Sequence, residues 1–342
     1  MPAPKQIAST EAPNSTGTPS SKPVAAPEPV GSGRFIGIEI GGTKLQLVVG
    51  TADGVILGRQ RYQVDRARGA EGICEKIAEA IPQLIAAHRV CAIGVGYGGP
   101  VHWRTGQVAK SYHIPGWSDF PLGSWLYETT GLAVFVENDA NTAALGEAIH
   151  GAGAGCDPVL WMNAGSGVGG GLVVNGAIYH GAPPGEMELG HLRLERAGRI
   201  TEDFCSGWSV DREVREAAER NPCGSLAQRV RESGLHEGQA RLLKPALEAG
   251  DLEAAAILDK TAESLAYALS HAVHLLHPET IILGGGLALI GEPLRERIEA
   301  ALAKWIMDAF LPAPPIRLAA LMEDAVLVGA LALAAQRHHP RR

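Results

Sequence analysis

The chain has 342 residues, of which 46% are apolar and 20% are charged, and its formal net charge is −7. That length predicts two domains, each large enough to bury its own core. The lack of a basic stripe argues against a nucleic-acid partner, and no apolar run reaches the ~18 residues of a membrane span. Five widely spaced cysteines and no export signal lead us to expect a cytoplasmic protein without a disulfide framework.

Residues 1–33 are rich in Pro, Ala, Ser and Thr and lack periodic large apolar side chains. Such a segment cannot offset the conformational entropy that ordering would cost. We therefore expect a disordered tail over residues 1–33. Its prolines also argue against a DNA-binding pair of helices ahead of Phe35.

Residues 35–60 predict three short apolar strands joined by two tight turns. The second turn is Asp53-Gly54, which is a strong hairpin signal. The first turn, Gly41-Gly42-Thr43-Lys44, is rich in glycine and carries a hydroxyl group. Beyond these strands the periodicity predicts a helix near 72–88, strands at 92–97 and 133–137, and a helix at about 140–150.

Residues 159–181 repeat the plan of the first meander, with a Gly/Ser turn and then an Asn-Gly turn between apolar strands. Two matched meanders predict two domains, each of which presents one glycine hairpin to a shared cleft. A long helix over 251–276, a buried strand that runs into Gly284–Gly286 and a closing helix over 325–335 complete an α/β pattern.

The two glycine turns offer backbone amides that no side chain hinders, and Thr43 and Ser166 add hydroxyl donors. Two such turns facing each other would hold phosphate oxygens. The first turn is not a P-loop, because it joins two strands and lacks the leading GxxxxG spacing. Each turn taken alone is equally typical of an ordinary tight hairpin, so the phosphate hypothesis depends on the repetition.

Asp139 follows a strand that ends at Glu137 and directly precedes a helix. A carboxylate in that place often caps the helix, which is worth about 1 kcal/mol. A carboxylate at a strand end in a cleft is also suited to accept a hydroxyl proton as the general base of phosphoryl transfer. This motif alone favours the cap.

Glu188 and His191 stand three residues apart just after the second meander. Such a pair suits hydrogen bonds to adjacent sugar hydroxyls or a share in a metal site, although a single histidine near a turn is more often structural. Gly284–Gly286 would let a base or ribose lie against the backbone. The same glycines would equally serve a close strand-to-helix turn.

In this order the motifs resemble the ROK family of sugar kinases and sugar-responsive repressors, within the actin-like ATPase and hexokinase superfamily. The resemblance covers about residues 34–336. It rests on EIGGTK, GYGGPV, VENDANTAALGE, GSGVGGG, ELGH and IILGGG, with VGALALA near the end.

The resemblance implies an α/β fold of two actin-like (ribonuclease H-like) domains with an inter-domain cleft. The first domain would span 34–139 and be completed by a C-terminal helix over 322–337, and the second would span 140–321. It also implies ATP and Mg²⁺ as cofactors, a small-molecule sugar as substrate, and a homodimer or higher homo-oligomer.

Residue by residue, the resemblance reverses the preference at Asp139, which matches the family's catalytic base. The positions that match its sugar-binding residues are Asn138, Gly99, Glu188, His191 and Glu202. The positions that match its nucleotide-binding motifs are Gly41, Gly42, Thr43, Lys44, Gly165, Ser166, Gly167, Gly284, Gly285 and Gly286.

Three positions depart from the family pattern. Glu39 stands where the first phosphate motif usually has Asp, so we expect a changed water-mediated contact to Mg²⁺ and lower activity. After the ELGH motif only Cys205 remains of the usual cysteine cluster, and one thiolate with one imidazole cannot fill a tetrahedral zinc site. We therefore expect no zinc. His113 replaces an asparagine found in many family kinases, which leaves the choice of sugar open.

We predict ATP-dependent phosphorylation of a hexose, foremost glucose at its 6-hydroxyl, with Asp139 as the base. The alternatives are a sugar-sensing regulator without turnover and a sugar-binding protein of the same fold that Glu39 has weakened. The sequence leaves open which hexose or N-acetylhexosamine is used, whether ATP or polyphosphate is the donor, and the oligomeric state.

Overall fold

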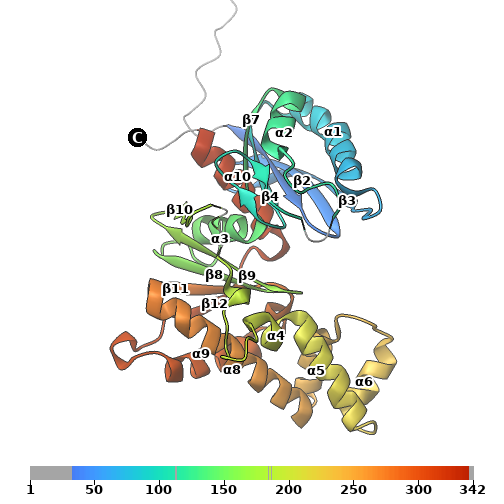
Figure 1. Ribbon diagram of the computed structural model, residues 1–342, viewed down its shortest axis with the longest axis vertical. Helices are drawn as coiled ribbons and strands as arrows, with labels where there is room; N and C mark the ends of the chain where they lie inside the picture. The colour runs from blue at the N-terminus through green and yellow to red at the C-terminus, as the bar shows by residue number, and fades with distance from the viewer. Residues whose placement is uncertain (1–32, 112–113, 184, 186, 339–342) are drawn as a thin grey trace, which may run out of the picture. The chain divides into compact units, whose positions relative to one another are not determined.

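Two five-stranded sheets with the same strand order organise the fold (Figure 1). In each sheet an antiparallel three-stranded meander comes first, and two further strands extend the sheet in parallel from the meander's first strand. The first sheet has the order β3-β2-β1-β4-β7 and the second β10-β9-β8-β11-β12. The predicted repeat of the meander is therefore confirmed.

The strands of the first sheet are β1 (Arg34–Ile40), β2 (Lys44–Thr51), β3 (Ile56–Gln63), β4 (Val90–Tyr97) and β7 (Ala133–Asn138). Those of the second are β8 (Val159–Ala164), β9 (Val168–Val174), β10 (Ala177–Ile178), β11 (Thr280–Gly284) and β12 (Ile316–Leu318). A separate short pair is formed by β5 (Val101–His102) and β6 (Gln107–Val108).

The α-helices are α1 (Gly69–Ala87), α2 (Leu122–Thr130), α3 (Asp139–His150), α4 (Thr201–Cys205), α5 (Gly207–Arg220), α6 (Ser225–Ser233), α7 (Leu243–Glu248), α8 (Leu252–Leu276), α9 (Glu292–Trp305) and α10 (Ala325–His338). The 3₁₀ turns are η1 (Leu189–His191), η2 (Gln239–Leu242), η3 (Gly286–Ile290), η4 (Asp308–Phe310) and η5 (Met322–Asp324).

The computed structural model describes residues 33–111, 114–183, 185 and 187–338. Apart from Gly33, the predicted disordered tail lies outside the described residues. The chain from Gly33 onward forms one compact unit, so the domain boundaries expected at 139 and 321 stay predictions.

Helix α1 packs on the first sheet through the apolar face that its periodicity predicts. Ile73, Ile77 and Leu84 are buried there, and Ile85 packs beside them. The other large core lies against the second sheet and gathers apolar side chains of α5, α8 and α9. Each sheet therefore has its own apolar layer.

Helices α3 and α10 pack against each other and connect the two sheets, α10 against the first and α3 against the second. Glycines permit the close approach. A Cβ on Gly94 of β4 would collide with the Ala330 carbonyl of α10, and a Cβ on Gly329 would collide with the Thr142 carbonyl of α3. Because α3 begins at Asp139, this packing also fixes one side of the predicted site.

Several helix boundaries differ from the prediction; α1, for example, begins at Gly69 and not near residue 72. Residues 322–324 form the 3₁₀ turn η5, so the α-helix expected from 322 starts at Ala325. Asp251 is the N-cap of α8 and not its first residue, because its side chain accepts hydrogen bonds from the amides of Glu253 and Ala254.

Candidate active site

Asp139 is the first residue of α3, and Asn138 ends β7 just before it. The Asn138 side-chain oxygen accepts hydrogen bonds from the amides of Ala140 at 2.9 Å and Asn141 at 3.1 Å. Asn138 is therefore the N-cap, and the interpretation of Asp139 as the cap is wrong. Asp139 accepts the Ala140 amide through Oδ1 at 2.8 Å, and its Oδ2 has no hydrogen-bond donor in the described part of the chain.

The Asp139 carboxyl group lies in surroundings that disfavour its charge. A Cβ on Gly98, just after β4, would come within 3.5 Å of Asp139 Oδ2. Burial, together with the nearby carboxylates of Glu39 and Glu188, raises the pKa of Asp139 to about 6, although the Ala140 N–H opposes the shift. A carboxyl group with a pKa near 6 can hold or release a proton close to neutral pH.

A cavity of about 440 Å³ opens at Asp139. Several predicted site residues line it together, namely Glu39, Lys44 and Gly284–Gly286. Residues of the first sheet, the second sheet and the start of α10 all contribute to its wall. The glycines of the two predicted phosphate turns, Gly41, Gly42, Gly165 and Gly167, are not part of this lining.

The first glycine turn is closed by its own backbone, because the Gly41 amide donates to the Lys44 carbonyl at 3.0 Å. The Gly41 N–H is therefore not free for an anion. The amides of Gly42 and Thr43 donate no hydrogen bond within the described residues, so they are the donors that this turn leaves available.

Glu39, at the end of β1, is 8% exposed and has both carboxylate oxygens engaged. The Lys44 ammonium lies 3.1 Å from Oε1, and Gln46 donates to Oε2 at 2.8 Å. Gln46 is itself fully buried, in the mostly apolar strand β2. These two contacts hold the Glu39 side chain at the wall of the cavity.

The second glycine turn repeats the geometry of the first, because the Gly165 amide donates to the Gly167 carbonyl at 2.9 Å. The amides of Ser166 and Gly167 have no acceptor among the described residues. Glu202 supports this turn by accepting the Val168 amide at 2.7 Å through Oε1. A Cβ on Gly167 would collide with the same carboxylate, so the close contact requires glycine.

Four of the predicted sugar-binding residues form two pairs. Asn138 donates through Nδ2 to the Gly99 carbonyl at 3.2 Å. His191 Nδ1 lies 3.3 Å from Glu188 Oε2, and both side chains are more than half exposed. Because Glu188 also raises the pKa of Asp139, its carboxylate acts on the same site.

The glycine run after β11 has three different surroundings. Gly284 packs against the Trp161 ring, where a Cβ would collide with it, whereas Gly286 faces open space. Gly285 has a φ of +85°, a value that glycine adopts without strain. The run therefore offers bare backbone to the cavity at Gly286.

The sequence matches the ROK family from residue 35 to residue 337. This chain belongs to the ROK family. It is 31% identical to a glucokinase of Thermotoga maritima over 316 residues, which cover 89% of this chain and 98% of that protein. The predictions of the ROK family and of its actin-like α/β fold are therefore confirmed.

Other ROK relatives represent both classes of function that the sequence left open. A crystal structure of a ROK family glucokinase from Streptomyces griseus, in complex with glucose and AMPPNP, has a TM-score of 0.74 and 29% identity, covering 89% of this chain and all of that one. A putative xylose repressor from Caldicellulosiruptor sp. is 24% identical and is matched over 88% of this chain and 78% of that protein.

In this ROK chain, side-chain contacts hold the loop between His191 and Cys205. Arg199 pairs with Glu195, its Nε 2.9 Å from Oε2, and its guanidinium carbon lies 4.0 Å from the Phe204 ring centroid. The Cys205 thiol is buried, and this burial raises its pKa to about 12. Because zinc binds the thiolate, this cysteine is a poor ligand.

Within the described residues, no group of three or more His, Cys, Asp or Glu side chains is arranged to hold a metal ion. The expected lack of zinc stays a prediction. His113 lies outside the described residues. Over the described part of the chain, no helix is both long and apolar enough to cross a membrane.

Sequence reasoning missed one buried pair beside the site. Glu137, the last residue before Asn138, lies 2.5 Å from His180 through Oε2 and Nε2. The available signal was an acidic residue at the end of the apolar strand VFVEN, where burial requires a partner.

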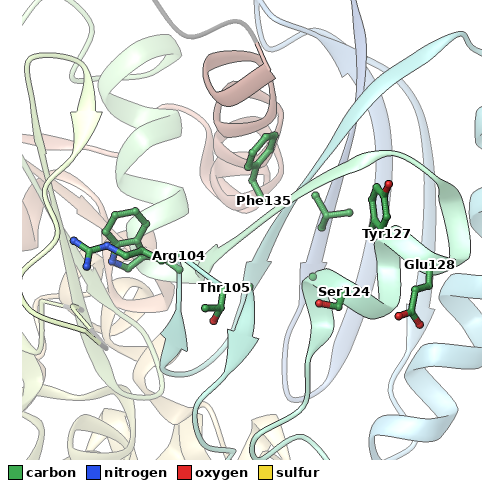
Figure 2. A pocket seen from close by; sticks show the side chains of 10 residues that line it. Arg104, Thr105, Ser124, Tyr127, Glu128 and Phe135 are labelled. Atoms are coloured by element: carbon green, nitrogen blue, oxygen red, sulfur yellow. The ribbon is translucent and has the colours of Figure 1, made fainter.

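A second cavity, of about 430 Å³, contains none of the predicted site residues. It lies between the turn after β5, helix α2 and strand β7, with Thr105, Ser124 and Glu128 on its wall (Figure 2). Of these two cavities, only the one at Asp139 is lined by predicted site residues.

Proposed function

We propose that this ROK protein is an ATP-dependent hexose kinase that transfers the γ-phosphoryl group of ATP to the 6-hydroxyl of glucose. Relatives named glucokinase, 29% to 31% identical over nearly the whole chain, support this activity. In the structure, the observation that carries the proposal is the Asp139 carboxyl group, which lines a cavity and has a pKa raised to about 6.

In the proposed reaction the sugar 6-hydroxyl oxygen attacks the γ-phosphorus. The bond from the γ-phosphorus to the ADP oxygen breaks, and the hydroxyl proton passes to Asp139. The free Oδ2 of Asp139 is the natural acceptor, because Oδ1 already accepts the Ala140 amide. Phosphoryl transfer of this kind depends on positioning and charge neutralisation, which are the tasks of the surrounding residues.

The sugar would lie between Asn138 and the Glu188–His191 pair. Asn138 uses its oxygen for the cap and one amide hydrogen for Gly99, so one hydrogen remains for a sugar hydroxyl. The Glu188 and His191 side chains are more than half exposed. Glu202 keeps one oxygen beyond its bond to the second glycine turn, and that oxygen would accept a further sugar hydroxyl.

The nucleotide would use the free amides of both glycine turns. Gly42 and Thr43 in the first turn and Ser166 and Gly167 in the second are the available phosphate donors, and Lys44 would add a positive charge. The adenosine would lie against Gly286, where the backbone faces open space. In this proposal the Gly41 and Gly165 amides donate no hydrogen bond to phosphate, because each already donates to a carbonyl within its own turn.

The residues present fit Mg²⁺, because Glu39 offers a carboxylate at the wall of the cavity that Asp139 also lines. Glu39 would hold the ion through water, since Lys44 and Gln46 already engage both of its oxygens. When bound, Mg²⁺ would neutralise charge on the β- and γ-phosphates.

We also propose that the protein acts in the cytoplasm, where ATP is abundant, and that it assembles as a homodimer or higher homo-oligomer. ATP is the proposed donor because the Streptomyces griseus relative is described with AMPPNP. Polyphosphate is the competing donor, to be compared directly with ATP.

The test is a panel of hexoses and N-acetylhexosamines, with each of the two donors and Mg²⁺, in which ADP release and product phosphate are measured. We expect glucose with ATP to give the highest kcat/KM. A sugar-sensing regulator would bind a sugar, as judged by calorimetry, and turn over none of the panel. That outcome would overturn the kinase proposal.

A further inference from the structure

Glu137 is a buried carboxylate, 2% exposed, at the end of β7. Its Oε1 accepts the Asn138 amide at 3.0 Å and the Asn141 side-chain amide at 3.1 Å. Its Oε2 lies 2.5 Å from His180 Nε2. A buried carboxylate is costly unless each oxygen has a partner, so these contacts hold the β7–α3 junction in one arrangement.

His180 reaches this junction from the other sheet, two residues after β10 ends. Its ring stacks on Trp103, which follows β5, with the ring centroids 4.1 Å apart and an interplanar angle of 18°. The side chain of His180 is only 8% exposed. His180 therefore lies against both Glu137 and Trp103 and ties a segment of the second sheet to the start of α3.

Two further charged groups lie on the Trp103 side of the pair. The guanidinium carbons of Arg104 and Arg337 lie 4.8 Å and 5.4 Å from the Trp103 ring centroid. Neither guanidinium has an ion pair or hydrogen bond to Glu137 or His180 within the described residues. Within the described residues, His180 is therefore the hydrogen-bond partner of Glu137 Oε2.

We propose that His180 and Glu137 are positioning residues that hold the first turn of α3, and with it the Asp139 carboxyl group, in the geometry needed for proton abstraction. This inference rests on the proposed kinase function. Without the His180 nitrogen, Glu137 Oε2 would be buried without a partner, and the carboxylate would reorganise and release the Asn138 amide. A displacement of ~1 Å at a reacting group can lower the rate by about 100-fold.

Two substitutions at His180 separate its two contacts. His180→Phe keeps an aromatic ring to stack on Trp103 and removes the nitrogen that reaches Glu137. His180→Gln removes the ring and offers an amide nitrogen near the position of Nε2. We expect His180→Phe to lower kcat for glucose by roughly 10- to 100-fold, with KM for ATP within about twofold, and His180→Gln to restore most of the loss.

Glu147 supplies the matched control, because it is a second buried carboxylate, in the last turn of α3. It accepts the amides of Ala152, Ala320 and Leu321 and has no contact with Asp139. Glu147→Gln should lower the melting temperature at least as much as His180→Phe and leave kcat near the parent value. If the two variants lost kcat in proportion to stability, the pair would be merely structural and the inference wrong.

A double-mutant cycle completes the test. On a Glu137→Ala background His180→Phe should change kcat by less than about twofold, because the carboxylate that His180 contacts is absent. An equal loss on both backgrounds would overturn the inference. If the parent chain phosphorylates no hexose, the kinase proposal fails on its own, and glucose affinity becomes the test of the His180–Glu137 pair. His180→Phe should then weaken glucose binding, and His180→Gln should preserve it. Equal glucose affinities in the parent and His180→Phe would overturn the inference.

Discussion

At the scale of single residues, the surroundings of Asp139 suit its proposed role as a base but lower the stability of the fold. Burial and the neighbouring carboxylates raise its pKa to about 6, which suits a base that must take a proton near neutral pH. The same surroundings disfavour the ionised form, so the folded state is less stable when Asp139 carries its charge. Function and stability at this residue therefore respond to pH in opposite directions.

We first predict the pH dependence of the rate. A general base works only when deprotonated, so kcat/KM for glucose should fall as the pH drops through about 6, tenfold per pH unit below it. Steady-state rates measured between pH 5 and pH 8 at saturating ATP would show this decrease in kcat/KM. A rate that stayed level down to pH 5 would mean that Asp139 does not titrate in the free enzyme as proposed.

Stability gives the second prediction. Because the pKa of Asp139 is raised from 3.8 to about 6, the folded protein loses stability as the pH rises across that interval, and the cost is complete above it. Asp139→Asn keeps the acceptor for the Ala140 amide and removes the charge, so it should stabilise the protein by ~1–3 kcal/mol at pH 7.5 and much less at pH 4.

Thermal unfolding at both pH values would measure this difference. The control is Asp53→Asn in the exposed Asp-Gly turn, which suits asparagine equally well and should change little at either pH. A gain for Asp139→Asn that did not depend on pH would point to a change in packing.

The third prediction concerns Glu39, whose carboxylate is held by Lys44 and Gln46 at the cavity wall. Glu39→Gln should reduce kcat with little change in glucose affinity, since metal placement matters most as charge moves in the transition state. Glu39→Asp should preserve or raise kcat, because a shorter side chain leaves room for water on Mg²⁺.

Rates over a range of Mg²⁺ concentrations would test this, with Glu323→Gln as the control. Glu323 lines the same cavity, and its side chain is 70% exposed. If Glu39→Gln matched the parent at low Mg²⁺, Glu39 would be a strand-end residue without a role at the metal.

The sequence could predict the chemistry of these residues better than their contacts. Asn138 and Asp139 are both good capping residues, and which of them caps depends on whether β7 ends one residue earlier or later. Local spacing does not settle that question, because the end of β7 is set by its pairing with β4. Glu137 was missed for a similar reason, since its partner His180 lies 43 residues away.

At the scale of elements, the loop from His191 to Cys205 is informative because predicted sugar contacts stand at both of its ends. Its hairpin is closed by a bridge between Arg193 and Ile200. The contacts of Arg199 with Glu195 and Phe204 hold the segment that leads into Glu202. We infer that these contacts give the loop its shape without a metal ion.

The fourth prediction follows from this loop. Arg199→Gln should raise KM for glucose several-fold with little change in kcat, because Glu202 would lose its support while Asp139 stays in place. Arg196→Gln, an exposed change in the same loop, is the control and should leave KM unaltered.

Elemental analysis should find no stoichiometric zinc in the protein, and activity should return after chelation once Mg²⁺ is restored. One tightly held zinc per chain would contradict this account of the loop.

For the Arg199→Gln variant, an unchanged KM for glucose would contradict the proposed role of the Arg199–Glu195 ion pair.

The elements were predictable where one face is apolar and the periodicity is regular, as in α1 and α8. Glycine and Asp-Gly or Asn-Gly signals likewise placed both meanders. The loop after His191 was not predictable in this way, because Arg199 and Phe204 meet through side-chain packing that has no period. The 3₁₀ turn η5 was also missed, since helix signals do not mark where an α-helix replaces a tighter turn.

At the scale of the whole described chain, two sheets of identical strand order meet through the helices α3 and α10 (Figure 1). The repeated meanders made the duplication visible in the sequence. The close crossing of α3 and α10 was not visible, because it depends on Gly329 and Gly94 meeting carbonyl groups far along the chain. This crossing is what places the start of α3 beside the cavity.

The central claim is that Asp139 is the base of an ATP-dependent hexose kinase, and turnover of Asp139→Asn tests it most directly. The parent chain with glucose, ATP and Mg²⁺ should release ADP and form glucose 6-phosphate. Asp139→Asn should lower kcat by about 10²- to 10⁴-fold, while calorimetry gives glucose and nucleotide affinities within about threefold of the parent. Near-parent turnover by Asp139→Asn would contradict the account.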